Sequence, residues 1–299
     1  MLGLDDFKFV MKGADERLQG LTDRHDIYPA IDPQPAFASK AFAGKAVLIT
    51  GASRGIGPVI ATFYARAGAM LALVARSASN LEAVKKRIQE ENIGTDILTF
   101  AQDVKDTAAA AKAVQDTVDH FGHLDILVTN AGVSLPIDGT LIGDRDVKQW
   151  WNTVEVNLLG TLNFVSPSLS HLKKTKGYVI ALSSIGAVLR NQSASDYGIS
   201  KFALNRLIEF IALEYEDVTS FAVHPGAIWT DMAEITGLRA DFFVDTPELP
   251  SATILALSSG RYNWLKGRFI DSTVDLGDVE KLKEEILAKD ALVAKLVLP

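Results

Sequence analysis

The stretch Thr50-Gly51-Ala52-Ser53-Arg54-Gly55-Ile56-Gly57 follows a short apolar run, residues 46–50, and leads into an amphipathic segment, residues 56–67. This pattern predicts a buried strand, a turn and a helix. The three glycines let the backbone turn tightly and approach a ligand without Cβ clashes. The helix N-terminus beyond them offers free N–H groups and a positive dipole end. The turn therefore predicts a pyrophosphate site for a dinucleotide, although this spacing alone fits a plain glycine-rich turn about equally well.

The same alternation continues along the chain. Strands are expected at residues 46–50, 70–75, 96–101, 124–129, 178–182 and 219–223, and helices at 56–67, 81–91, 108–121, 147–173 (with a bend at Pro167) and 194–215. Short apolar strands that alternate with helices indicate a parallel sheet covered on both faces. We therefore predict an α/β fold: a single-domain, Rossmann-like, doubly wound parallel sheet of about seven strands. Such a sheet binds its ligand outside the carboxyl ends of the strands.

Three segments are expected. Residues 1–44 form an N-terminal extension, residues 45–275 the catalytic domain with an apolar, aromatic lid at 226–245, and residues 276–299 a C-terminal helical extension. The first extension is predicted to hold a short helix over 4–18. Pro29, Pro33 and Pro35 then favour an extended tether on the surface. Beyond the lid, we expect a helix over 246–257, a strand over 266–271 and a charged amphipathic helix over 278–297.

Bulk properties exclude several classes of protein. The chain has 299 residues, a formal net charge of −7 and no cysteine. The negative charge argues against nucleic-acid binding, and the absence of cysteine excludes disulfides and thiolate sites. The apolar runs are too short to span a bilayer, and the N-terminus lacks a secretory pattern, so we expect a cytoplasmic protein without membrane contact. The five histidines show no ligand spacing, so no metal site is expected.

Tyr197 and Lys201 lie four residues apart, which places them on one face of a helix. An ammonium group beside a phenol stabilises the phenolate, so we expect Lys201 to lower the pKa of Tyr197. When a carbonyl accepts hydride, its oxygen needs a proton and a hydrogen-bond donor. A lone tyrosine on a helix is usually a packing residue. Together with the glycine-rich turn, however, the pair predicts a hydride-transfer site with Tyr197 as general acid.

The sequence resembles the short-chain dehydrogenase/reductase family, whose turn reads Thr-Gly-x-x-x-Gly-x-Gly. Further motifs match in order: Asn130-Ala131-Gly132 after the fourth strand, Asn157 within a helix, Ser184 thirteen positions before Tyr197, and Pro225-Gly226 after the sixth strand, with Thr230 beyond. The resemblance covers roughly residues 45–271, and the terminal regions look like those of fungal members. It implies the fold described above and a nicotinamide cofactor.

The resemblance also implies roles for particular residues. Ser184 would donate to the substrate oxygen, Lys201 would also hold the nicotinamide ribose, and Asn157 would fix the long helix and a water on the proton path. Ser183 is a rival donor, but its side chain should face away because side chains alternate along a strand. The expected catalytic residues are Asn157, Ser184, Tyr197 and Lys201. The expected cofactor-binding residues are Gly51, Ser53, Arg54, Gly55, Ile56, Gly57, Arg76, Ser77, Asp103, Val104, Asn130, Ala131, Gly132, Tyr197, Lys201, Pro225, Gly226, Ile228 and Thr230.

The choice of dinucleotide depends on the end of the second strand. NAD-selective relatives place an acid there, which accepts from the ribose 2′-hydroxyl. Here the position is Ala75, followed by Arg76 and Ser77, and Arg54 stands in the turn. Two guanidinium groups and a hydroxyl suit a 2′-phosphate, so we predict NADP(H), although either arginine alone could simply be solvated.

The predicted activity is that of an NADP(H)-dependent carbonyl reductase acting on a small hydrophobic ketone. Two alternatives stay open: a non-catalytic NADP-binding regulatory or scaffolding protein, and an epimerase or dehydratase that uses a transient hydride step. The apolar lid could equally be ordinary packing or a subunit contact. The chain reads Ser272-Thr273-Val274 soon after the point where many relatives have Asp-Gly-Gly, which puts the usual tetramer in doubt. We therefore expect a homodimer or a homotetramer.

Overall fold

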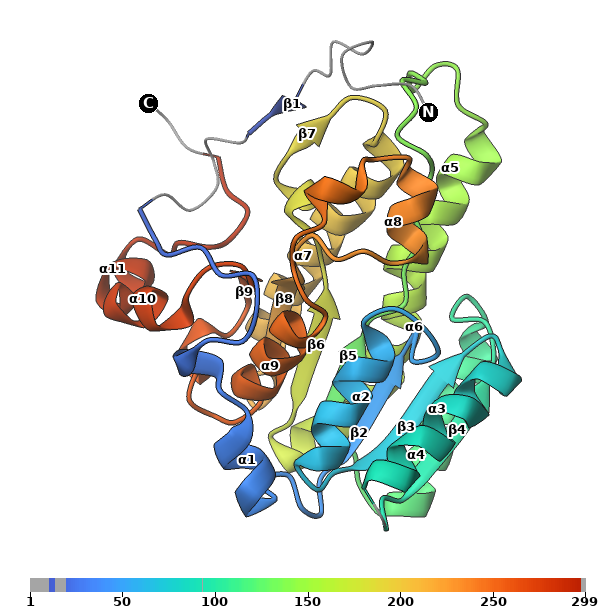
Figure 1. Cartoon of the computed structure of the whole chain (residues 1–299), viewed down its shortest axis with the longest axis vertical. Coiled ribbons are helices and arrows are strands. Elements are labelled where there is room, and N and C mark those ends of the chain that lie inside the picture. The colour runs from blue at the N-terminus through green and yellow to red at the C-terminus, as the bar shows by residue number, and fades with distance from the viewer. Residues whose placement is uncertain (1–10, 14–19, 93, 297–299) are drawn as a thin grey trace.

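A parallel sheet forms the centre of the computed structural model, which describes residues 11–13, 20–92 and 94–296. Within these residues the sheet has seven strands, in the order β4-β3-β2-β5-β6-β8-β9 (Figure 1). Their bounds are β2 Ala46–Thr50, β3 Met70–Ala75, β4 Ile97–Ala101, β5 Ile126–Thr129, β6 Tyr178–Leu182, β8 Thr219–His224 and β9 Arg268–Asp271. All neighbouring pairs are parallel. The predicted doubly wound α/β fold is confirmed.

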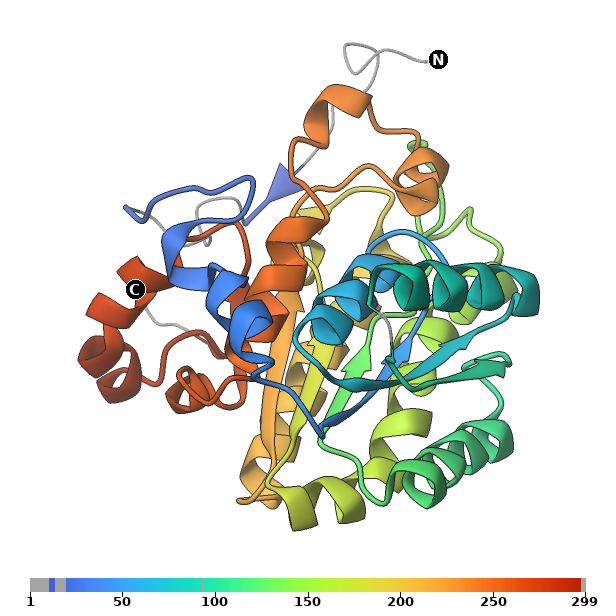
Figure 2. The same cartoon turned by 60° about the horizontal axis from the view of Figure 1, so that its bottom comes forward.

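Helices cover both faces of the sheet, as Figure 2 shows. One core cluster joins the sheet to α2 (Gly57–Arg66), α3 (Ala78–Glu91) and α9 (Glu248–Leu257). The other joins it to α4 (Thr107–Phe121), α6 (Gly160–Thr175) and α7 (Ser195–Glu214). Every residue of β2, β5 and β8 is buried, which explains why β2 and β5 are apolar up to their final threonine instead of alternating.

The strand order reverses between β2 and β5. From β2 the chain runs to β3 and β4 on one side, and β5, β6, β8 and β9 follow on the other. The loops after β2 and β5 therefore diverge at the carboxyl edge of the sheet and leave a crevice between them. The glycine-rich turn follows β2 and Asn130 follows β5, so the fold brings these two motifs together. The end of β6, with Ser183 and Ser184, lies one strand further along.

The N-terminal extension is not the surface tether that its prolines suggested. Residues 29–31 form a 3₁₀ turn and α1 spans Gln34–Ser39, with a proline in the first turn of each, where a missing N–H is tolerated. Phe37 and Phe42 are buried in the main core, edge-on against Phe63 and Tyr64 of α2 at 5.4 and 5.3 Å between ring centroids. The extension thus completes one face of the domain.

Most of the helix expected over 4–18 lies outside the described residues. Within the described part, Met11–Lys12 form strand β1, which pairs antiparallel with β7 (Arg190–Asn191). That contact places residues 11 and 12 beside the segment that leads into Tyr197.

The long helix expected over 147–173 is interrupted. It divides into α5 (Val147–Val154), a π-helical turn (Glu155–Leu159) and α6, and α6 continues through Pro167. A π turn inside a helix is rare and often marks a functional position. Here it contains Asn157.

The single C-terminal helix expected over 278–297 was also wrong. The chain forms α10 (Leu276–Lys281) and α11 (Lys283–Ala288), and residues 289–296 are not helical. Asp290 and Leu292 have left-handed φ angles of 45° and 65°, which end the helix. Among the described residues, no helix has the length and apolar character needed to cross a bilayer.

Candidate active site

The glycine-rich turn has the backbone that its sequence requires. Gly51 and Gly55 have φ angles of 66° and 62°, in the region that favours glycine. Gly57 opens α2, and a Cβ placed on it would lie 2.2 Å from the Gly51 carbonyl oxygen. The turn therefore folds back closely on itself, and glycine is needed at 57 for space and not for its dihedral angles.

The turn is bonded to the loop that follows β5. The Thr50 hydroxyl accepts from the backbone N–H groups of Asn130 and Ala131 at 3.1 and 3.2 Å. The Asn130 side-chain amide donates to the carbonyl oxygens of Thr50 and Gly51, both at 3.0 Å. Asn130 is thus a structural link between the two loops that border the crevice.

A cavity of about 360 Å³ opens at this carboxyl edge. Thirteen of the predicted cofactor residues line it: Gly51, Ser53, Arg54, Gly55, Ile56, Arg76, Ser77, Asp103, Val104, Asn130, Ala131, Gly132 and Thr230. Six do not, namely Gly57, Tyr197, Lys201, Pro225, Gly226 and Ile228. Prediction from sequence missed the lining residues Asn80, Gln102, Val133, Val156, Asp231 and Met232. Most of these adjoin a predicted residue, so their position next to a motif was the available signal.

The donors around the cavity fit a dinucleotide. The cavity includes the N-terminal end of α2 and the glycine-rich turn, which suit a pyrophosphate. The Gln102 Nε2 atom is buried and has no hydrogen-bond partner among the described residues, which leaves a donor for a ligand. The Asp103 Oδ1 atom accepts from the Lys105 N–H at 2.9 Å, while the cap of α4 is Asp106, so Asp103 does not cap that helix.

The two arginines predicted to read the phosphate differ in their surroundings. Arg54 pairs with Asp231 of α8 (Asp231–Thr236) at 2.7 Å, and both side chains are more than half exposed. Arg76 is exposed at the rim of the cavity and takes part in none of the ion pairs found among the described residues. Ser77 caps α3 by accepting from the Asn80 N–H at 3.3 Å, and its hydroxyl also shares a hydrogen bond of 3.2 Å with the Ser79 hydroxyl.

Tyr197 and Lys201 lie on the first two turns of α7, next to the end of β6. The Lys201 amine is 5.7 Å from the centroid of the Tyr197 ring and donates to the Leu182 carbonyl oxygen at 2.6 Å. Burial lowers the pKa of Lys201 to about 8. Burial raises the pKa of Tyr197, and a hydrogen bond with the Ser184 side chain offsets part of this rise. The expectation of a lowered tyrosine pKa was wrong for this structure because burial outweighs the other influences.

The two neighbouring serines face opposite ways, as strand alternation predicted. The Ser183 hydroxyl is buried and donates to the Oδ1 atom of Asn205, a residue of α7, at 2.5 Å. The Ser184 Oγ atom accepts from the Gly186 N–H at 3.0 Å and faces Tyr197. Of the two, only Ser184 has a hydroxyl directed at the tyrosine.

Asn157 is fully buried, and its whole side chain is engaged. Its Oδ1 atom accepts from the Val133 N–H at 2.8 Å, and its Nδ2 atom donates to the Val133 carbonyl at 3.0 Å and to the Ser200 hydroxyl at 2.9 Å. Because Val133 adjoins the cavity and Ser200 precedes Lys201, Asn157 fastens the loop after β5 to the helix that carries the tyrosine and the lysine.

Residues 226–245, the segment expected to form a lid, contribute Thr230, Asp231 and Met232 to the lining of the cavity. Thr230 caps α8 by accepting from the Ala233 N–H. Trp229 packs edge-on against Phe243, with ring centroids 5.3 Å apart, and both Trp229 and Phe242 are about half exposed. The Thr236 carbonyl accepts from the Ile137 N–H at 2.9 Å, which joins the lid to the loop after β5. The described residues contain no group of histidine and carboxylate side chains suited to a metal ion.

Comparison with known proteins agrees with this geometry. The family described as short chain dehydrogenase matches residues 45–239, well over half of the chain. The chain belongs to the short-chain dehydrogenase/reductase family. Members of this family are oxidoreductases that bind a nicotinamide dinucleotide, and membership places this chain among them.

Its relatives include fungal proteins, which confirms that part of the resemblance. It is 39% identical over 287 residues to the Monascus purpureus protein named short chain dehydrogenase mpl6, and the match covers 92% of this chain and 94% of that one. It is 38% identical over 193 residues to the Arabidopsis thaliana protein named 11-beta-hydroxysteroid dehydrogenase-like 2, with 63% and 61% covered. A dehydrogenase/reductase of Sinorhizobium meliloti 1021 superposes with a TM-score of 0.70 at 28% identity, with 81% and 99% covered.

Proposed function

We propose that this short-chain dehydrogenase/reductase is an NADP(H)-dependent carbonyl reductase that acts on a hydrophobic ketone. The observation that carries the proposal is the grouping of Ser184, Tyr197 and Lys201 beside the cavity that the glycine-rich turn lines at the carboxyl edge of the sheet. A non-catalytic dinucleotide-binding protein has no chemical need for all three side chains in this arrangement.

Each side chain has its own role in the reduction. A dinucleotide bound in the cavity would supply the hydride. Ser184 donates its hydroxyl hydrogen to the carbonyl oxygen of the substrate. Its own oxygen accepts from the Gly186 N–H, which fixes the position of the hydroxyl. Tyr197 gives its phenolic proton to that oxygen as it becomes an alkoxide. Its raised pKa keeps the phenol protonated at neutral pH, which suits an acid in the direction of reduction.

Lys201 stabilises the phenolate that remains on Tyr197. The ammonium has three N–H groups, and one donates to the Leu182 carbonyl. The Lys201 nitrogen lies close to Gly132, which lines the cavity, since a Cβ built on Gly132 would be 3.5 Å from it. A second N–H group of the ammonium is therefore available toward the cavity. With a pKa of about 8, Lys201 keeps its charge at neutral pH. Asn157 acts indirectly, since it fixes the loop and the helix on which these groups stand.

The lid favours an apolar substrate. Trp229, Phe242 and Val244 are about half exposed around it, and the facing loop adds Leu141 and Ile142, which are also exposed. Apolar side chains left in the open beside a crevice gain free energy when a hydrophobic ligand covers them. The similarity to a protein named for 11-beta-hydroxysteroid dehydrogenase supports including fused-ring ketones among the candidates.

Arg76 supports the preference for NADP(H). It stands at the rim of the cavity, directly after β3, with its guanidinium group free to bind a 2′-phosphate. Arg54 would contribute only when its ion pair with Asp231 opens or is shared, because that carboxylate now accepts its hydrogen bond. We therefore assign the larger part of the discrimination to Arg76.

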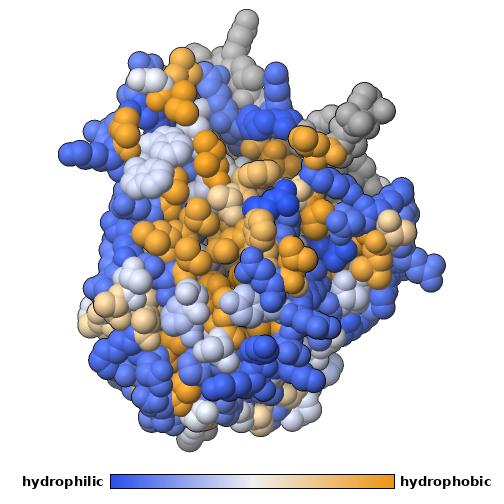
Figure 3. All heavy atoms as spheres, turned by 180° about the vertical axis from the view of Figure 1, so that it is seen from behind, coloured by the Kyte–Doolittle hydropathy of each residue, from blue (hydrophilic) through white to orange (hydrophobic). Residues whose placement is uncertain are grey.

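An exposed apolar face supports the proposal of a homodimer. Seen from behind relative to Figure 1, the molecule shows hydrophobic atoms gathered across the middle of that face (Figure 3). Exposed apolar side chains lie on one side of α7 at Ile199, Phe202, Phe210 and Leu213, and Leu162 on α6 is also exposed. Light scattering on the purified chain should give twice the mass of the 32.3 kDa chain, and a monomer would contradict the proposal.

The test of the proposed activity is NADPH oxidation at 340 nm against a panel of aliphatic, aromatic and fused-ring ketones, with NADH in parallel. We expect ketone-dependent consumption of NADPH and formation of the matching alcohol, with slower consumption of NADH. Tight NADPH binding without turnover on any ketone would favour the regulatory alternative. Conversion of a substrate without net NADPH consumption would favour an epimerase or dehydratase.

A further inference from the structure

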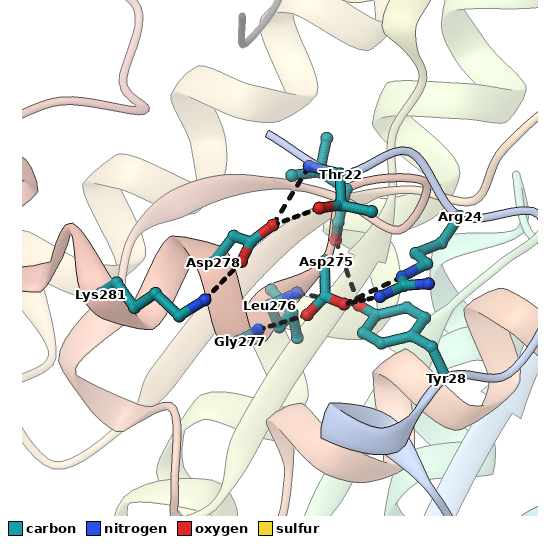
Figure 4. Close-up of polar contacts among 9 residues, drawn as sticks. Thr22, Arg24, Tyr28, Asp275, Leu276, Gly277, Asp278 and Lys281 are labelled. Carbon is teal, nitrogen blue, oxygen red and sulfur yellow. Dashed lines mark hydrogen bonds and ion pairs between the residues drawn. The ribbon is translucent and has the colours of Figure 1, made fainter. Parts of the chain in front are cut away.

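Residues 20–28 of the N-terminal extension are held tightly against the C-terminal part of the domain (Figure 4). The Thr22 hydroxyl and N–H donate to the Asp278 Oδ2 atom at 2.6 and 3.2 Å. The Arg24 guanidinium donates twice to the Asp275 Oδ2 atom, at 2.9 and 2.7 Å. The buried Tyr28 hydroxyl donates to the Val274 carbonyl and accepts from the Leu276 N–H, both at 3.1 Å. These contacts fix the backbone on both sides of residues 25 and 26.

The intervening residues reach the end of the lid. The His25 Nδ1 atom lies 2.6 Å from the Asp245 Oδ1 atom. The His25 carbonyl accepts from the Thr246 N–H at 3.0 Å, and the Asp26 carboxylate accepts from the Thr246 hydroxyl at 2.8 Å. Asp245, the last residue of the lid, and Thr246, which follows it, are therefore both bonded to the extension, which lies more than two hundred positions away in the sequence.

Asp245 in turn ties the end of the lid to its beginning. Its Oδ2 atom accepts from the Ala227 N–H at 2.6 Å, and its own N–H donates to the Ala227 carbonyl at 3.0 Å. Next to this pair, Gly226 has a φ angle of 100°, and a Cβ on it would lie 2.7 Å from the Asp245 Oδ2 atom. The Asp245 side chain is only 4% exposed, so its position is set by these partners and by His25.

We propose that His25 is a positioning residue of the active site. It orients the Asp245 carboxylate, which joins the two ends of the lid next to Gly226, and it thereby makes the N-terminal extension a working part of the site. The proposal rests on the proposed function, because the lid is assigned there to substrate binding.

A purely structural role would have a different signature. The His25 side chain is 60% exposed, and the buried Asp245 carboxylate keeps the Ala227 N–H as a donor when the histidine is removed, so global stability should change little. Loss of the contact should therefore loosen the lid while the melting temperature stays nearly unchanged. A small displacement of a group that positions a substrate can lower the rate up to about a hundredfold.

The experiment compares three variants of the full chain. His25→Ala removes the contact, and His25→Asn keeps a donor near the position of Nδ1. His120→Ala is the matched control, because His120 pairs with Asp96 at 2.9 Å on an exposed surface of α4. We expect kcat/KM for the ketone to fall about tenfold in His25→Ala, to recover largely in His25→Asn, and to stay at the wild-type value in His120→Ala.

A second readout does not depend on turnover. Arg239 is an exposed trypsin site within the lid. We expect cleavage after Arg239 to be several times faster in His25→Ala than in wild type, His25→Asn or His120→Ala, at unchanged melting temperature. The proposal would be overturned if His25→Ala kept both the wild-type cleavage rate and the wild-type kcat/KM. It would also be overturned if kcat/KM fell only together with the melting temperature. If no ketone is turned over, the proposed function fails, while the cleavage rates still decide whether His25 holds the lid.

Discussion

Replacing Gly57 with alanine should weaken cofactor binding because the added methyl group has no room. Its Cβ would lie 2.2 Å from the Gly51 carbonyl oxygen, 2.9 Å from the Ala52 Cα and 2.9 Å from the Asn130 side-chain nitrogen. Two of these three neighbours are backbone atoms of the turn, so the turn itself must move. Overpacking of this kind costs about 1–3 kcal/mol. If the displaced turn must return to its place to bind the pyrophosphate, the NADPH Kd should rise roughly 5- to 150-fold.

The assay is a titration of NADPH fluorescence with each variant, alongside thermal melting. Gly143→Ala is the matched control, because Gly143 is exposed and a Cβ there would meet no atom within 4 Å. We expect the control to bind NADPH with the wild-type Kd. If Gly57→Ala bound NADPH as tightly as Gly143→Ala, the dinucleotide would not lie against this turn, and the assignment of the cavity would be refuted.

Three further predictions concern charge and packing. Arg76→Asp should raise the KM for NADPH about tenfold or more and favour NADH, whereas Arg87→Asp on the exposed side of α3 should change neither; equal effects would place the 2′-phosphate elsewhere. Because burial lowers the pKa of Lys201 to about 8, its charge is lost as the pH rises through that value, and kcat/KM for NADPH should fall there. Lys201→Arg stays charged and should show no such fall; an identical pH profile would exclude Lys201 as its source. Phe37→Ala should lower the free energy of unfolding by about 3–5 kcal/mol in denaturant melts, and a change below 1 kcal/mol would show that the extension is not part of the core.

Sequence alone predicted the sheet well because local signals mark its strands. The bounds expected for β2, β3 and β6 agree with the structure residue for residue, since glycine or polar residues adjoin each apolar run. The extension was misjudged for the opposite reason. Its prolines are a local signal, whereas the burial of Phe37 and Phe42 depends on aromatic side chains of α2 that lie more than twenty positions away in the sequence. The break within residues 147–173 also lacked a local signal, because nothing in the side-chain pattern marks a π turn.

The candidate site shows the same contrast between features that local motifs mark and features that depend on distant contacts. The glycine-rich turn, Asn130 and Thr230, which the motifs singled out, all line one cavity. The contact of His25 with Asp245 could not be predicted, because it joins residues 220 positions apart that belong to no motif. The direction of the Tyr197 pKa shift was missed because burial, which sequence does not report, outweighs the favourable groups around the phenol.

The central claim is that the Tyr197 hydroxyl protonates the substrate oxygen during reduction. The most direct measurement compares Tyr197→Phe with wild type in single-turnover oxidation of bound NADPH by the best ketone of the panel, with the NADPH Kd measured on the same samples. Loss of a general acid typically costs 10²- to 10⁴-fold in rate. We predict a loss of about that size with an NADPH Kd within about twofold of wild type. A Tyr197→Phe variant that reduces the ketone at nearly the wild-type rate would contradict the claim.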